Sequence, residues 1–483
     1  MEHYSHSLSL AKSPSFWHEF ATYKCQSVKR FQRETAALPV KGAGSILSED
    51  PYFEQRQIAI VGNEPEALLL SVLFSEEKIP TYLVGPFEGF EVRNPGNARD
   101  EAQWLLHLHT RNDSIRQLAD PDDLPSSKIH SIIVTGHATT QSETSELERT
   151  VHTVSKNLQI GSNFIFSGLC RPGYTLGTIG ETIEKHSGMS IDSEVGLGYL
   201  PLLWNGEQIQ DVRDKPIIMA ATSERVASRM QDMFLRIFPA ITCTTKIGSA
   251  EAAGLFAPIY REVVGALELE LASLCQNERV DYREAADLCR VSGLPRLGAP
   301  RSAPARDTLA SIIALSTIGA RDSRLIRAAK RVNEHAPSQI FALIKGALAL
   351  CGRRVRHSKI AILGLDGLQP VSRLKPSPPQ ILNTLRRRGA TVSLYPGETT
   401  GWTANAYSES VNMEKSVSNA IRKANCAVIA LDKPSEADLN PQILASEMAR
   451  PGAVCDLTRV LEASNVERAG LFYTSIGRGS PGS

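Results

Sequence analysis

The sequence predicts an α/β protein in which two Rossmann-like, doubly wound lobes are joined by a long central helix and a helical layer. A short buried-strand pattern ending in glycine occurs at Gln57–Gly62 and again at Lys359–Gly364. Alternating helix and strand patterns follow each one, as expected for a parallel sheet with crossover helices. Between them, Ile247–Cys275 repeats apolar side chains every three or four positions, which predicts a long helix.

Length and composition set the limits of this organisation. A chain of 483 residues is too long for one core. We expect an extension over residues 1–54, a first lobe over 55–243, a helical layer over 244–340 and a second lobe over 341–483. Lys and Arg number 53 against 52 Asp and Glu, so no charge excess favours a nucleic acid or an anionic membrane as a partner.

The cysteines and the apolar segments favour the cytoplasm. The eight cysteines are dispersed, with no C-x-x-C pair and no His–Cys spacing suited to zinc, so we expect no metal site. No segment approaches about 18 uninterrupted apolar residues, and the first 54 residues lack the apolar core of a signal peptide. We therefore expect a cytoplasmic protein without a membrane partner.

The first lobe is predicted from its alternating patterns. After the first strand we expect these helices and strands: Glu66–Leu73, Thr81–Gly85, Ile129–Val134, Glu146–Leu158 and Asn163–Ser167. The loop after the first strand keeps only Gly62 of the G-x-G-x-x-G fingerprint. Glu64 and Glu66 stand where an anionic pyrophosphate would bind, and Pro65 removes an amide donor. We therefore expect no conventional dinucleotide binding in this loop.

The central helix carries one apolar stripe, which consists of Leu255, Ile259, Val263, Leu267, Leu271 and Leu274. Ser249 is its expected cap, and Pro258 should kink or restart it. The elements expected after it are Asp281–Val291, Thr308–Ile318, Ile326–His335, Pro379–Arg388, Thr391–Tyr395, Val417–Ala424, Ala427–Leu431, Pro441–Met448 and Val454–Asp456.

Several motifs in this order resemble the UDP-glucose/GDP-mannose dehydrogenase family. They are Ser249-Ala250-Glu251, Ala266–Ala272, Arg331–Pro337, Leu363-Gly364-Leu365, Ser377-Pro378, Val454-Cys455-Asp456 and Tyr473 with Ile476-Gly477-Arg478. The resemblance implies an NAD-binding domain at 55–243, a dimerisation domain at 244–340 and a nucleotide-sugar-binding domain at 341–483. It also implies oxidation of a sugar alcohol in two NAD-dependent steps through a cysteine thiohemiacetal.

The residues that the family uses for this chemistry are mostly replaced here. The position of the nucleophilic cysteine is Ala303, although the nearby aspartate is kept as Asp307. The lysine position is Gly254 and the asparagine position is Pro258. Further family positions are occupied by Gly168 (threonine), Leu202 (glutamate), Leu203 (arginine), Leu368 (lysine) and Lys375 (arginine).

Alanine cannot form a thiohemiacetal, and glycine or proline cannot carry a proton or stabilise an oxyanion. We therefore expect a degenerate family member without UDP-sugar 6-dehydrogenase activity and without a cofactor.

Other groups are candidates for the old cleft. His137 follows the third strand and Cys170 follows the fourth, so each either faces the cleft or is an ordinary loop histidine or buried thiol. Asp307 is either a general base or a helix cap. Arg290 stands near the place of a family arginine that reaches a substrate across the dimer, and Lys375 is a conservative replacement in the second lobe.

Three hypotheses remain open from the sequence. The chain is a pseudoenzyme that binds or assembles with a partner, as a homodimer or with an active homologue. Alternatively, it catalyses a redox-neutral step on a non-sugar small molecule, or it is an atypical dehydrogenase that uses NAD. A collapsed cleft would favour the first, a closed apolar cavity the second, and an open cleft lined by amides the third.

Overall fold

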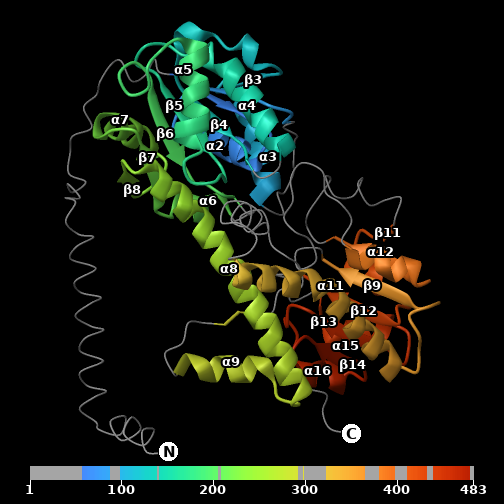
Figure 1. Cartoon of the computed structure of the whole chain (residues 1–483). Helices are drawn as coiled ribbons and strands as arrows, with labels where there is room; N and C mark the ends of the chain where they lie inside the picture. The colour runs from blue at the N-terminus through green and yellow to red at the C-terminus, as the bar shows by residue number, and fades with distance from the viewer. Residues whose placement is uncertain are drawn as a thin grey trace, which may run out of the picture. The chain divides into compact units, whose positions relative to one another are not determined.

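The computed structural model describes residues 57–87, 98–138, 141–204, 208–291, 297–298, 323–364, 380–396, 411–431 and 439–478, all within the compact unit Gln55–Ser483. These residues form two doubly wound sheets and a long helix, which confirms the predicted fold class (Figure 1). Among the helices that the structure describes, none is both long and apolar enough to cross a membrane.

The first sheet has eight strands in the order β3-β2-β1-β4-β5-β6-β7-β8. Neighbouring strands are parallel except β6 and β7, which are antiparallel. The strands are β1 (Gln57–Val61), β2 (Thr81–Val84), β3 (Ile115–Leu118), β4 (Ile129–Thr135), β5 (Asn163–Ser167), β6 (Gly196–Leu200), β7 (Ile217–Ala221) and β8 (Ile241–Thr244). The helices of this lobe are α2 (Pro65–Glu76), α3 (Ala98–Arg111), α4 (Gln141–Ser155), α5 (Glu181–Ser187), α6 (Ile209–Arg213) and α7 (Glu224–Phe234).

Strand β1 shows why the sequence folds this way. Ile58 and Ile60 belong to one apolar cluster, together with residues of α2. Ala59 and Val61 belong to another, together with residues of α4. Because successive side chains of a strand point to opposite faces, a strand covered on both faces must be apolar throughout. The run Ile58–Val61 meets that requirement, and the strand predicted there is confirmed.

The second sheet has six strands in the order β11-β10-β9-β12-β13-β14, and its paired strands are parallel. The strands are β9 (Lys359–Leu363), β10 (Thr391–Tyr395), β11 (Asn412–Met413), β12 (Cys426–Ile429), β13 (Ala453–Asp456) and β14 (Phe472–Ser475). Its helices are α12 (Gln380–Arg387), α14 (Val417–Ile421), α15 (Pro441–Glu447) and α16 (Ala463–Arg468). The predicted segment Thr308–Ile318 lies outside the described residues.

The central helix α8 spans Ile247–Asn277, and α9 (Tyr282–Val291) and α11 (Arg324–Leu350) follow it. Helix α8 contacts β6, β7 and α11, and α11 also contacts β13 and β14. Two local expectations were wrong. The residue before the helix is Lys246, so Ser249 lies within the first turn and is not the cap. The helix also does not restart at Pro258, since α8 is continuous and Pro258 lies buried inside it.

The predicted apolar stripe of α8 is only partly buried. Leu255 is buried, but Leu267 and Leu274 are 47% and 58% exposed. Besides Ile247, Leu255 and Leu269, the buried residues of α8 are small or acidic, namely Ala250, Glu251, Gly254, Pro258, Glu262, Ala266, Glu268 and Ala272. Small side chains let the helix axis approach its neighbours closely, so burial follows residue size here as well as hydrophobicity.

Glu251 fixes the beginning of α8 to the loop after β5. Its carboxylate is fully buried and accepts the backbone N–H groups of Gly173 and Thr175, the latter at 2.8 Å. The Cys170 thiol donates to the same carboxylate at 3.5 Å. A buried carboxylate is tolerated only when donors of this kind surround it. Thr175 also begins the π-helix Thr175–Gly180, so one side chain orders both the loop and that turn.

We predict that Glu251→Gln lowers the free energy of unfolding by about 2 kcal/mol, because one amide oxygen would replace two carboxylate oxygens that accept buried N–H groups. The measurement is the urea midpoint by circular dichroism. Glu270→Gln is the matched control, because Glu270 lies exposed on the same helix. Equal midpoints for the two variants would contradict the role assigned to Glu251.

Candidate functional site

The candidate site lies at the carboxyl ends of β1, β4 and β5, where the strand order of the first sheet reverses and doubly wound sheets bind their ligands. Gly62 follows β1 with φ +149°, and a Cβ added there would lie 2.2 Å from Thr135 Oγ1. Gly62 is therefore required by the close approach of β4. Its presence alone does not indicate a nucleotide.

The two glutamates of the loop take up the space at the start of α2. Glu66 is buried, and its Oε1 accepts the backbone N–H of Trp204 at 2.7 Å. Glu64 Oε2 lies 3.7 Å from His137 Nε2. The N-terminus of a helix offers free N–H groups and a positive dipole end, which normally attract a phosphate. Here Glu64 and Glu66 add negative charge at this end of the helix, although Glu64 makes no capping bond with its side chain.

His137 follows β4 and lies beside Glu64. Ligand atoms of Glu64, Glu66 and His137 lie within 4.8 Å of one another, so the group could hold a metal ion by distance alone. However, His137 Nδ1 accepts the N–H of Leu169 at 3.0 Å. This geometry assigns the proton of the neutral ring to Nε2, whereas a metal-binding Nε2 needs its lone pair and usually leaves Nδ1–H to donate. The arrangement therefore suits an electrostatic contact between Nε2–H and the Glu64 carboxylate better than a cation.

The lysine position, Gly254, faces a closed space. A Cβ added to Gly254 would lie 2.9 Å from Tyr199 Oη and 2.9 Å from Pro201 Cβ. Tyr199 is fully buried, and its hydroxyl donates to the carbonyl of Gly168 at 2.8 Å. The phenol of Tyr199 thus fills the volume into which a longer residue at position 254 would extend.

Cys170 is a buried thiol. Its pKa is raised well above the ordinary value, first by burial and then by the nearby charge of Glu251. The nucleophilic form of cysteine is the thiolate, so this environment keeps the sulfur unreactive. The structure therefore supports the buried-thiol interpretation of Cys170 over a role as a replacement nucleophile.

Leu202 and Leu203, which the resemblance aligns with a family glutamate and arginine, lie in apolar surroundings. Leu202 belongs to the apolar cluster that includes Trp204 and β1. Leu203 packs in a small cluster with Leu169, Leu255 and Ile259. Side chains of this kind cannot take part in proton transfer or bind an anion, so these positions now serve packing.

The remaining predicted site residues are separate from these groups or lie outside the described part of the chain. Arg290 is exposed on α9 and lies 3.9 Å from Asp287. Ala303, Asp307 and Lys375 lie outside the described residues. The sequence analysis missed Tyr199, because a tyrosine within a buried strand belongs to no motif and reveals its role only by what it faces.

Comparisons with known proteins give a consistent relationship. No protein-family model matches the chain. A UDP-N-acetyl-D-mannosamine dehydrogenase of Pyrococcus horikoshii is 23% identical over 362 residues, which cover 74% of this chain and 83% of the relative. A UDP-glucose 6-dehydrogenase of Haloferax volcanii is 25% identical over 320 residues, or 63% of this chain and 71% of the relative.

Solved structures share the fold. A UDP-D-ManNAc dehydrogenase from Pyrococcus horikoshii has a TM-score of 0.71 at 20% identity, covering 88% of this chain and 99% of that one. A UDP-glucose dehydrogenase from Pyrobaculum islandicum has a TM-score of 0.69 at 14% identity, covering 90% and 100%. Together with the ordered motifs of the sequence, these relatives make the chain similar to UDP-sugar dehydrogenases, and the solved structures show that it shares their fold.

Proposed function

We propose that this chain is a pseudoenzyme of its family. It does not oxidise UDP-sugars, it binds no nicotinamide cofactor, and it works as a binding or assembly partner. The observation that carries the proposal is the closed space at Gly254, where Tyr199 and Pro201 leave no room for a catalytic side chain. The space beside Gly254 is filled and not simply empty. Replacing Gly254 alone by a longer residue therefore cannot restore the lost catalytic group.

The loop after β1 supports the absence of a cofactor. A pyrophosphate bound at the start of α2 would lie close to the carboxylates of Glu64 and Glu66. Two like charges about 4 Å apart repel by about 4 kcal/mol at an effective dielectric constant of about 20. Pro65 at the first position of α2 also provides no N–H group to offset this repulsion.

The assembly role is supported by an exposed apolar row on α8. Phe256, Tyr260, Leu267 and Leu274 are 67%, 63%, 47% and 58% exposed. Their spacing of four, seven and seven residues places them along one side of the helix, which is the pattern of a helix–helix seam. We propose that this row packs against a second copy of the chain or against an active homologue.

A second candidate function is a redox-neutral step on a small molecule, and one observation favours it. His137 and Glu64 form a carboxylate–imidazole pair at the ligand-binding edge of the sheet. Because Nδ1 of His137 accepts the N–H of Leu169, the group of this pair that can accept a proton from a substrate is the Glu64 carboxylate. The filled surroundings of Gly254 and the buried thiol of Cys170 favour the first proposal, because they resemble a collapsed cleft more than a reshaped one.

The closed space is tested by two glycine substitutions on α8. Gly254→Ala should destabilise the protein by about 1–3 kcal/mol, because its Cβ meets Tyr199 and Pro201 at overpacking distances. Gly265→Ala should instead stabilise it by up to about 1 kcal/mol, because nothing lies within 4 Å of the added Cβ and alanine favours a helix. Urea denaturation measures both. A neutral or stabilising Gly254→Ala would mean that the site is open.

The absence of cofactor binding and activity is tested with purified full-length protein. We expect millimolar NAD to leave the melting temperature unchanged, whereas a ligand at a hundred times its Kd would stabilise the folded state by about 2.7 kcal/mol. No NADH should form with UDP-glucose or related nucleotide sugars. The variant Ala303→Cys should also form no NADH. Steady turnover that disappeared in an Asp307→Asn variant would establish the atypical dehydrogenase instead.

The exposed row is tested by charge. The double variant Tyr260→Asp, Leu267→Asp should be monomeric in size-exclusion chromatography with light scattering. In a dimer formed through this row, each aspartate would lose its contact with water, which is unfavourable. Leu235→Asp is the matched control, because Leu235 is 51% exposed and lies outside α8. If the double variant and the control give the same dimer, the association does not use this row.

A further inference from the structure

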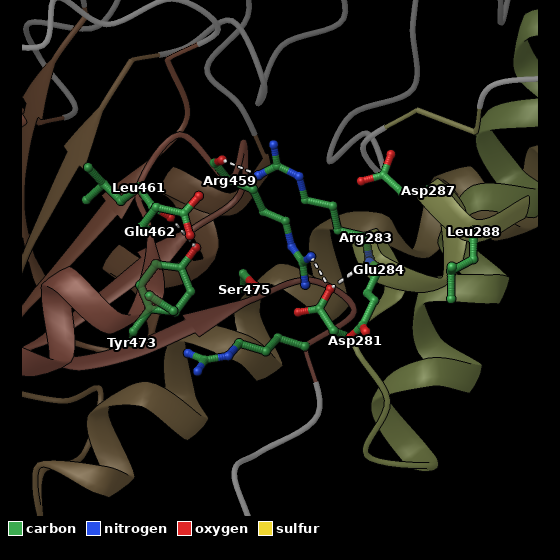
Figure 2. A pocket seen from close by; sticks show the side chains of 12 residues that line it. Asp281, Arg283, Glu284, Asp287, Leu288, Arg459, Leu461, Glu462, Tyr473 and Ser475 are labelled. Carbon is green, nitrogen blue, oxygen red and sulfur yellow. Dashed lines mark hydrogen bonds and ion pairs between the residues drawn. The ribbon is translucent and has the colours of Figure 1, made fainter. Parts of the chain in front are cut away.

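A second cavity lies between α9 and the carboxyl ends of β13 and β14 (Figure 2). Its volume is about 490 Å³, which is enough for a small metabolite. Arg459 and Tyr473 line it from the second lobe, and Asp281 and Arg283 line it at the start of α9. Figure 2 shows Arg459 extending toward Asp281, with Arg283 beside the loop that carries Arg459.

The loop after β13 holds Arg459 in a defined position. Asp456 is fully buried, and its Oδ1 accepts the N–H groups of Thr458 at 3.2 Å and of Arg459 at 2.7 Å. Its other oxygen accepts the N–H of Leu461 at 2.9 Å. Arg459 has φ +55°, a left-handed conformation that a non-glycine residue adopts only where its surroundings enforce it. The backbone therefore presents the Arg459 side chain to the cavity in one orientation.

The guanidinium of Arg459 has two buried N–H groups without a hydrogen-bond partner among the described residues. Its side chain is only 10% exposed, and Nη1 donates to Asp281 Oδ1 at 2.8 Å. The buried Nε and Nη2 atoms have no hydrogen-bond partner among the residues that the structure describes. These two N–H groups lie side by side and form the fork that binds a carboxylate or a phosphate through two parallel bonds. A buried donor without a partner is unfavourable, so this edge indicates a ligand.

The charge around the cavity favours a carboxylate over a phosphate. Glu284, Asp287 and Glu462 also line the cavity. The other lining arginine of the second lobe, Arg478, is already paired with Glu467 at 3.0 Å. A dianionic phosphate would be repelled by this acidic rim, whereas amino or hydroxyl groups of a monoanionic ligand could donate to it.

We propose that this cavity binds a small carboxylic acid that carries amino or hydroxyl groups. The ligand carboxylate would accept two hydrogen bonds from Nε and Nη2 of Arg459, and the remaining donors of the ligand would face the acidic rim. The proposal is independent of the function proposed above, because every residue that it uses lies on α9, on the β13–α16 loop or on β14.

The test is isothermal titration of the full chain with serine, glutamate and gluconate, and with inorganic phosphate in parallel. We expect saturable binding of at least one acid at one site and none of phosphate. Arg459→Lys keeps a positive charge for Asp281 but lacks the fork, so it should weaken binding by about tenfold or more. Arg283→Lys makes the same substitution at an exposed arginine of this cavity. It should change the Kd by less than about threefold, because the proposed ligand does not bind the guanidinium of Arg283.

Three results would overturn the proposal: preferred binding of phosphate, no saturable binding of any acid, or an unchanged Kd in Arg459→Lys. Circular dichroism checks that the variant is folded. If the variant is not folded, the test uses the nuclear magnetic resonance signal of the Arg459 Nε–H group in the wild-type protein. A carboxylate bound to the Nε and Nη2 groups must shift that signal as the acid is titrated. An unmoved signal at saturation would place the ligand elsewhere.

Discussion

The buried carboxylate of Glu251 is the contact on which the first lobe and the central helix both depend. Such a group is stable in the interior only because the backbone of Gly173 and Thr175 and the thiol of Cys170 donate to it. These donors come from the loop after β5, whereas Glu251 comes from α8. The contact therefore fixes how far the helix lies from the sheet, and this distance brings Gly254 against Tyr199.

The residues around the old cleft form one consistent packing arrangement. The Tyr199 ring lies where a longer residue at position 254 would extend, Leu203 and Leu255 belong to one apolar cluster, and Glu66 is held by the backbone of Trp204. At the described positions, Gly254, Leu202 and Leu203 each suit their neighbours in packing. Such complementarity is expected when a scaffold is kept for its shape, and it supports the proposal of a pseudoenzyme.

The two lobes differ in how their buried charges are satisfied. In the first lobe, Glu251 and Glu66 find their donors within the chain. In the second lobe, Arg459 lines a cavity and uses one nitrogen for Asp281, while its buried Nε and Nη2 atoms have no partner among the described residues. Burial of an ionised group is costly in both cases, so these two N–H groups are where an external ligand would contribute most.

The sequence by itself determined the two α/β lobes, the central helix and the resemblance to the family, because these depend on local periodicity and on ordered motifs. Ile58–Val61 must be a strand covered on both faces. The sequence also led us to expect that Glu64 and Glu66 disfavour a phosphate. It did not identify which face of α8 is buried, since most residues of that face are small or acidic.

Only the tertiary structure decided what fills each position. Glu66 and Trp204 are 138 residues apart, and Asp281 and Arg459 are 178 residues apart. No local pattern links such pairs, because their contact depends on how separate elements pack. The same holds for Tyr199 at Gly254: a glycine in a helix is compatible with an open pocket or a closed one, and only the neighbouring strand determines which is present.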